Sequence, residues 1–253
     1  MAQAKRGRPK SLSREIILDA AFRVVDADAM NDLTMSRLGR ELDADPSAVY
    51  RHFRNKDELL LAMADVMLEE SIQAYTSLPA TDDPVERLRR MCWTLRRSYL
   101  RRPGLARFVY FRFTGGEAEE ASVRTMLRDM HELGYSDDES IALARGVAEM
   151  TLGHISMTAD SLALPRKAQS VELEMARTYY TYDYVKPPVR SEAELREAQL
   201  ADGELVFSTM LETYLAGVVA GAPAGARARK ARSKRGAAAA PRATAKRAAA
   251  RVR

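Results

Sequence analysis

The stretch of sequence that decides the fold is residues 33–61, LTMSRLGRELDADPSAVYRHFRNKDELLL. It predicts two short helices separated by a tight turn and followed by a longer helix. Thr34 can cap the first helix, in which leucines recur at helical spacing. Asp45 and Pro46 predict a new helix start, because an aspartate accepts a free backbone N–H and a proline needs none at the first helical position.

The second short helix is predicted to have a small and polar outer face. Val49 and Phe53 lie four residues apart and are expected to face inward. This leaves on the outer surface Ser47, Ala48, Tyr50 and Arg51. Asn55 and Glu58 have the spacing of a capping box, which would open the longer helix. Two short helices around such a turn form a helix-turn-helix, whose second helix can enter the DNA major groove.

A run of residues in this stretch closely resembles the DNA-binding domain of TetR-family transcriptional repressors. The matching residues are Thr34, Leu38, Pro46, Ser47, Ala48, Val49, Tyr50, His52, Phe53, Asn55, Lys56, Leu59 and Leu60. The resemblance covers roughly residues 13 to 65 and departs from the family pattern at two turns, where Ala29 (or Asp28) and Asp43 stand in place of the usual glycine. Aspartate tolerates the left-handed conformation, so the helix-turn-helix turn is expected to be retained.

The expected DNA-binding residues are Thr34, Arg37, Ser47, Ala48, Tyr50, Arg51, His52, Lys56, Arg6 and Arg8. The resemblance implies that Tyr50 and Lys56 clamp backbone phosphates, and Arg51 is the residue best suited to read a guanine. Arg37 can contact DNA or remain a solvated charge. The N-terminal arm resembles the core of an AT-hook at residues 6–9, and it can reach the minor groove or be a disordered terminus.

Composition indicates an all-α protein with basic tails. The net charge of +5 hides an acidic centre, because residues 223–253 hold eleven Lys and Arg residues with no acid, and residues 1–10 hold four more. The predicted divisions are a flexible basic arm (1–10), the helix-turn-helix domain (11–56), a helical ligand-binding and dimerisation domain (57–221) and a disordered tail (222–253). We find no stretch of about 18 apolar residues and no signal-peptide pattern, so we expect a cytoplasmic, nucleoid-associated protein without membrane contact.

Helical periodicity continues through the second predicted domain. Helices are expected at about residues 56–77, 84–100, 118–133, 138–162 and 203–219. Pro103-Gly104 is expected to break the chain, and residues 164–201 are expected to be irregular apart from a short helix at 170–180. The resemblance implies a homodimer, with a four-helix interface made by the helices at 138–162 and 203–219. Small residues at 142, 148 and 153 would allow a partner helix to approach closely.

A small-molecule effector is expected to enter the helical core. The candidate pocket residues are Met67, Trp93, Phe108, Phe111, Met126, Met130, Met150 and His154. The simpler explanation of Trp93 is a core side chain, and that of His154 is a hydrogen-bonded core or surface histidine. The three histidines are far apart in sequence, and we find neither a Cys/His cluster nor a Gly-rich phosphate loop. We therefore expect no catalytic residues, no metal and no cofactor.

The resulting interpretation is a DNA-binding transcriptional regulator that is not an enzyme. It would bind a palindromic operator in double-stranded DNA as a homodimer, repress transcription, and be released by an unknown small-molecule effector. The alternative is an architectural or chromatin-associated protein whose basic tails supply most of the DNA binding.

Overall fold

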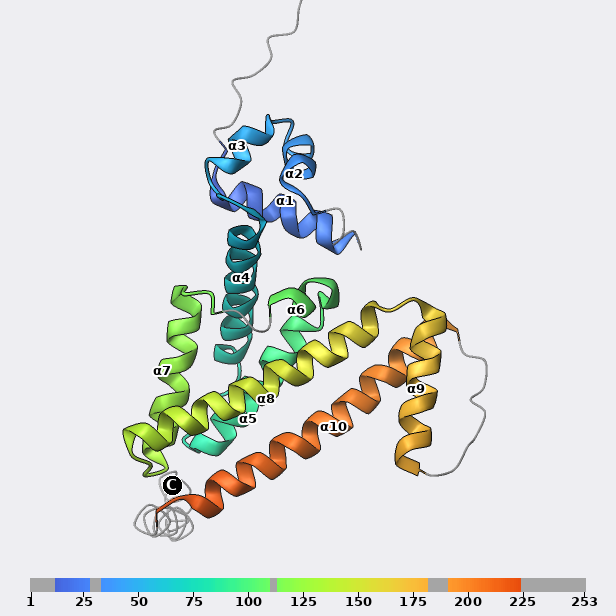
Figure 1. Cartoon of the computed structure of the whole chain (residues 1–253). Coiled ribbons are helices and arrows are strands. Elements are labelled where there is room, and N and C mark those ends of the chain that lie inside the picture. Colours follow the sequence, from blue (N-terminus) through green and yellow to red (C-terminus); the bar gives the residue numbers. More distant parts are fainter. Residues whose placement is uncertain (1–11, 28–32, 110–112, 182–190, 224–253) are drawn as a thin grey trace, which may run out of the picture.

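The computed structural model describes residues 12–27, 33–109, 113–181 and 191–223 (Figure 1). Across these ranges the chain forms ten helices and no strand, which confirms the all-α prediction. The helices are α1 (Arg14–Asp26), α2 (Met35–Glu41), α3 (Pro46–Tyr50), α4 (Lys56–Thr76), α5 (Pro84–Tyr99), α6 (Pro103–Val109), α7 (Glu117–Glu132), α8 (Asp137–Ala163), α9 (Arg166–Thr181) and α10 (Glu192–Gly221).

Helices α1, α2 and α3 form a small unit, here called the head, in which short side chains fix the helix starts. The Thr34 hydroxyl accepts a hydrogen bond from a backbone N–H in the first turn of α2 at 3.1 Å. The Asp45 carboxylate accepts one from the backbone N–H of Ser47 at 2.8 Å and so starts α3 at Pro46. Between α2 and α3, Asp43 adopts a φ of 48°, the left-handed conformation expected of this turn.

Helix α4 joins the head to the remaining helices α5–α10, here called the body. In Figure 1 the head lies at one end of α4, and α8 and α10 cross near its other end. One hydrophobic cluster runs through this junction, since it includes Ile17 and Leu38 of the head, Met67 of α4 and Ile155 of α8. Apolar burial therefore ties the orientation of the head to the position of α4 and α8.

The segment at residues 164–201 differs from the prediction. The short helix expected at 170–180 is present as the longer α9, but the first ten residues of α10 also lie in this segment, where an irregular chain and a helix starting only at Gly203 are expected from the sequence. Ser191 caps α10, because its hydroxyl accepts from the backbone N–H of Glu194 and its own N–H donates to the Glu194 carboxylate. The polar character of the segment was misread as irregularity, although a capped helix can carry polar residues wherever it faces solvent.

The Pro103-Gly104 pair also acts differently from the prediction. The two residues open α6 instead of interrupting the chain, and Pro103 occupies the first helical position. Proline suits this position, because its fixed φ is helical and the N–H that it lacks would have no partner inside the helix.

None of the helices among the described residues is both long enough and apolar enough to span a membrane.

Candidate DNA interface and effector cavity

The outward face of α3 lies at the end of the molecule farthest from α8 and α10 (Figure 1). Ser47, Tyr50 and Arg51 are exposed there, and the Tyr50 side chain is 51% accessible. Ala48 departs from the prediction, because only 8% of it is accessible. Helix α3 has only five residues and packs on α2, so Ala48 is covered by the head itself. The available face therefore consists of a hydroxyl, a phenol and a guanidinium.

The remaining predicted DNA-binding residues surround this face. Thr34 and Arg37 are exposed on α2, and His52 and Lys56 are half-buried at the end of α3 and the start of α4. The backbone carbonyl of His52 accepts a hydrogen bond from Arg14 at 2.6 Å, which anchors the end of α3 to α1. Arg6 and Arg8 lie outside the described residues.

Glu58 holds together the parts of the head that carry this surface. Its backbone N–H donates to Asn55 at 2.8 Å, as predicted, but its carboxylate accepts from the backbone N–H of Arg54 instead of that of Asn55. The same carboxylate pairs with the side chains of Arg54 and Arg14. Hydrogen bonds from the Arg54 backbone, the Arg54 side chain and Arg14 lower the pKa of Glu58 to about 2. The carboxylate is thus charged at neutral pH and links α1 to the start of α4.

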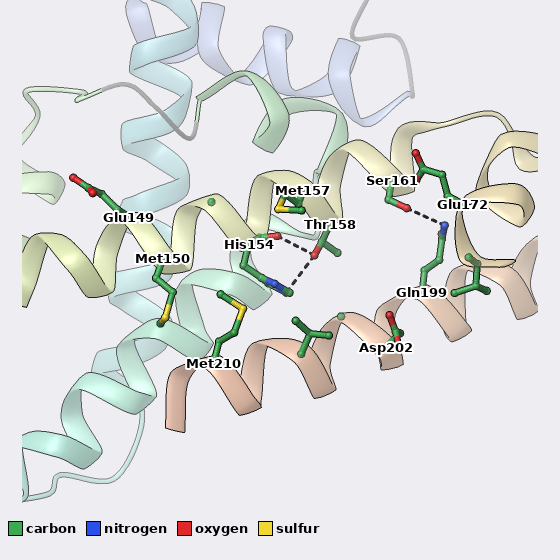
Figure 2. A pocket seen from close by; sticks show the side chains of 14 residues that line it. Glu149, Met150, His154, Met157, Thr158, Ser161, Glu172, Gln199, Asp202 and Met210 are labelled. Atoms are coloured by element: carbon green, nitrogen blue, oxygen red, sulfur yellow. Dashed lines mark hydrogen bonds between the residues drawn. The ribbon is translucent and has the colours of Figure 1, made fainter. Parts of the chain in front are cut away.

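Two hollows among the described residues of the body differ in character. The first, here called the outer groove, lies between α8 and α10 with α9 at one end and has a volume of about 500 Å³ (Figure 2). It is lined by Met150, His154 and Gln199 among others, and its rim carries exposed carboxylates at Glu149, Glu172 and Asp202. Exposed Met157 also lies along it, with 76% of the residue accessible.

A buried arginine lies beneath the outer groove. Arg96 of α5 is only 2% accessible, its guanidinium lies 5.6 Å from the centre of the Phe207 ring, and its nearest carboxylate is Glu204 at 3.6 Å. Burial, with the positive charge of Arg96 as a second cause, lowers the pKa of His154 to about 4. His154 is therefore a neutral imidazole near pH 7.

The second hollow, here called the closed cavity, lies between α4, α5, α7 and α8 and has a volume of about 110 Å³. Tyr75 of α4, Cys92 of α5, Met126 of α7 and Thr151 of α8 line it. Burial raises the pKa of the Cys92 thiol to about 11, so the thiol is protonated and unreactive near neutral pH.

A polar link joins α4 to the loop before α7, close to this cavity. The Thr114 hydroxyl donates to the Asp65 carboxylate of α4 at 2.9 Å and lies 3.2 Å from the Glu119 carboxylate. Gly116 lies so close to Asp65 that a side chain at this position would overlap its carboxylate. The loop before α7 is therefore in direct contact with α4.

Two family models match consecutive parts of the chain. The model described as "Bacterial regulatory proteins, tetR family" matches residues 17–63, and the model described as "Tetracyclin repressor-like, C-terminal domain" matches residues 77–221. The chain belongs to the TetR family of transcriptional regulators. It is accordingly a DNA-binding transcriptional regulator of the repressor type, and transcriptional regulators are not an enzyme class.

Known TetR-family proteins match over most of the chain. The tetracycline repressor protein class D of Escherichia coli is 29% identical over 214 residues, which cover 81% of this chain and 88% of that protein. A solved complex of BioQ with its natural double-stranded DNA operator is 29% identical, covers 68% of this chain and 99% of that chain, and has a TM-score of 0.52. The structure of Streptomyces coelicolor ActR with (S)-DNPA has a TM-score of 0.65 at 23% identity, covers 85% and 100% of the two chains, and shows the shared fold.

The structure divides the predicted pocket residues of this TetR-family chain among several environments. Met126 lines the closed cavity, and Met150 and His154 line the outer groove. Three others line neither hollow: Met67 and Met130 are fully buried in the two hydrophobic clusters, and Trp93 packs on Phe207 with ring centres 4.9 Å apart. The prediction gathered these residues into one pocket because their apolar character does not reveal which side of a helix they occupy.

Phe108, another predicted pocket residue, lines neither hollow. Phe108 is 40% accessible near the end of α6, and Phe111 lies outside the described residues. Ala148, expected to face a partner helix, instead lines the closed cavity.

Several cavity-lining residues were not predicted, among them Ser71, Tyr75, Thr125 and Thr151. These residues have hydroxyl groups on three different helices, α4, α7 and α8. Their helical spacing placed them on no distinctive face, so only the packing of helices distant in sequence shows that they share a cavity.

Proposed function

We propose that this TetR-family regulator is a homodimeric repressor that binds a palindromic operator through α3 and releases it when a small-molecule effector occupies the closed cavity. The observation that carries the proposal is the position of α3, whose outer face points away from the body at the far end of the molecule (Figure 1). Such a face can enter the major groove without rearrangement of the chain. Arg51 would read a guanine, and Tyr50 and Lys56 would hold phosphates.

A second copy of the chain would pack on the outer faces of α8 and α10. Met157 of α8 and Leu205 of α10 are 76% and 68% accessible, and exposed Val206 and Met210 extend the same apolar surface. Gly153 has open space in place of a side chain, which suits close approach of a helix. Large exposed apolar side chains gathered on neighbouring helices are typical of an interface. This arrangement would set two heads apart by one or more turns of DNA, about 34 to 36 Å or a multiple of it.

The closed cavity is the better effector site of the two hollows, because α4 forms part of its wall. A cavity of about 110 Å³ is smaller than a typical site for a drug-sized molecule, about 300 to 1,000 Å³. An effector of ordinary size must therefore push its walls apart. Moving α4 would change the spacing of the two heads and lower the affinity for DNA, because the effector and the operator would favour different states.

The proposal places the protein on DNA in the cytoplasm, with no membrane contact and no catalytic step. The competing interpretation, an architectural protein that binds through its basic tails, concerns residues outside the described ranges. It differs in one measurable property, since tail-driven binding depends on phosphate charge and not on sequence.

Selection of bound duplexes from a random library tests the proposed function. We expect one palindrome to be enriched, with a preference of about 10³ or more over random duplex. The selection should be repeated with a chain truncated to residues 11–222, which should enrich the same palindrome. Enrichment without sequence preference, or loss of all DNA binding on truncation, would support the architectural alternative instead.

A further inference from the structure

The side chains of the closed cavity define what it can bind. Among the described residues that line it, none is an acid, a base or a histidine. Leucine, isoleucine, methionine and alanine side chains form most of its surface, and the polar groups are hydroxyls and the protonated Cys92 thiol. A charged ligand would lose its hydration shell here without meeting an opposite charge, which is strongly unfavourable.

One buried hydroxyl in this apolar wall, that of Thr151, has no hydrogen bond of normal geometry among the described residues. Thr151 is 1% accessible, and its hydroxyl interacts only weakly with the neighbouring Cys92 thiol, whose pKa it lowers against the larger effect of burial. Most buried hydroxyls are paired, since leaving one without a hydrogen bond destabilises the folded chain. A threonine hydroxyl both donates and accepts, so it can pair with either a hydroxyl or a carbonyl group.

The outer groove is also lined mainly by apolar side chains, but it differs in carrying charged groups around it. Its rim carries three exposed carboxylates, and a buried cation, Arg96, lies beneath it. The two hollows would therefore select different molecules, and only the closed cavity has a wall made by α4.

We propose that the closed cavity takes an uncharged, largely apolar organic molecule with one hydroxyl or carbonyl group, which pairs with the hydroxyl of Thr151. This assignment rests on the proposed function, since it names the chemical class of the effector. The present volume suits a single-ring compound, and larger members of the same class would enter by displacing α4 or α7.

Binding of four single-ring probes of similar size to the full-length protein tests the assignment. The probes are toluene, benzyl alcohol, benzoate and benzylammonium, with dissociation constants measured by calorimetry. We expect toluene and benzyl alcohol to bind and the two ions to bind at least about 100-fold more weakly, because the cavity offers them no counter-charge. Tighter or equal binding of either ion, or no binding of any probe, would overturn the proposal.

Substitution of Thr151 tests the polar contact. Thr151→Val should weaken benzyl alcohol about tenfold and leave toluene unchanged, because valine keeps the shape and removes the hydroxyl. Thr151→Ser should retain benzyl alcohol binding. Thr94→Val is the matched control, since Thr94 is also buried but its hydroxyl already donates to the Arg90 carbonyl at 2.6 Å. Equal losses for toluene and benzyl alcohol in Thr151→Val would contradict a specific role of the hydroxyl.

The same protein should be assayed on its selected operator, so that the two proposals fail separately. If the chain binds its operator but prefers the charged probes, the result supports the proposed DNA function and contradicts the proposed ligand class. If the chain binds the uncharged probes but shows no preference for any operator, the result supports the proposed ligand class and contradicts the proposed repressor function.

Discussion

The contacts that stabilise the head differ in kind from the contacts that stabilise the body. In the head, each helix start is fixed by a side chain two or three residues away, as Asp45 does for α3. In the body, decisive contacts join distant parts of the chain, such as the ion pair of Arg89 with Glu212 at 2.6 Å and the hydrogen bond from Tyr214 to the Leu143 carbonyl at 2.8 Å. The helix starts of the DNA-reading surface are therefore locally encoded, although Arg14 also ties this surface to α1, whereas the ligand and partner surfaces depend on the packing of the whole body.

The largest expected effect comes from disrupting the body surface while leaving the head intact. Met157→Glu should abolish dimerisation and lower operator affinity at least about 100-fold, because two linked heads gain affinity from binding together. Sedimentation and operator titration would measure both quantities. The control is Val123→Glu, since Val123 is also exposed but lies on α7. A Met157→Glu protein that remained dimeric would contradict the proposed interface.

Substitutions in the head should distinguish the residue that recognises the DNA sequence from the residue that binds the DNA phosphate backbone. Arg51→Ala should lower discrimination at one position of each half-site by about 1 to 3 kcal/mol. Lys56→Ala should weaken binding to every sequence alike and reduce the dependence of affinity on salt. Competition titrations on operator variants would show the difference, with Arg124→Ala on α7 as control. Uniform losses for both head variants would contradict the division of roles.

The two regions should also respond to acid in different pH ranges. Burial places the folded-state pKa of His154 at about 4, below its usual 6.5, so the unfolded chain binds more protons between these values. The resulting stability is complete above pH 6.5 and is lost as pH falls toward 4, by about 1 to 2 kcal/mol after allowance for solvent screening. Glu58 contributes stability that is present above pH 4.5 and lost as pH falls toward 2.

Urea unfolding of His154→Asn and Glu58→Gln between pH 7 and pH 2 would measure these contributions. His154→Asn should flatten only the range from pH 6.5 to 4, and Glu58→Gln only the range below 4.5. An unchanged pH profile in His154→Asn would show that the histidine gains protons as easily in the folded chain as in the unfolded one.

The same contrast explains which features could be predicted from the sequence. Residues 33–61 predicted the helix-turn-helix, because the Thr34 and Asp45 caps and the Asp43 turn act within a few residues. Even there, the burial of Ala48 was missed, since it depends on how α3 packs against α2.

In the body, periodicity predicted most helices but not their neighbours. The sequence assigns Met126 and Met150 to one pocket, yet they line different hollows. Thr151 lies on the helically spaced stripe of residues 138–162, but the sequence did not indicate a binding role, because a threonine in a helix becomes a binding group only when other helices enclose it. The DNA-contact roles of the head residues stay predictions until an operator complex is measured.

The central claim is that filling the closed cavity changes the separation of the two heads. Spin labels at Ser36→Cys test it, because Ser36 is exposed on α2 and the single native cysteine, Cys92, is buried. Ala148→Phe would fill the cavity from α8, and Val123→Phe on the surface of α7 is the control. The account predicts that Ala148→Phe displaces the distance distribution between labels and weakens operator binding, while Val123→Phe matches the parent. Identical distributions in Ala148→Phe and the parent would contradict it.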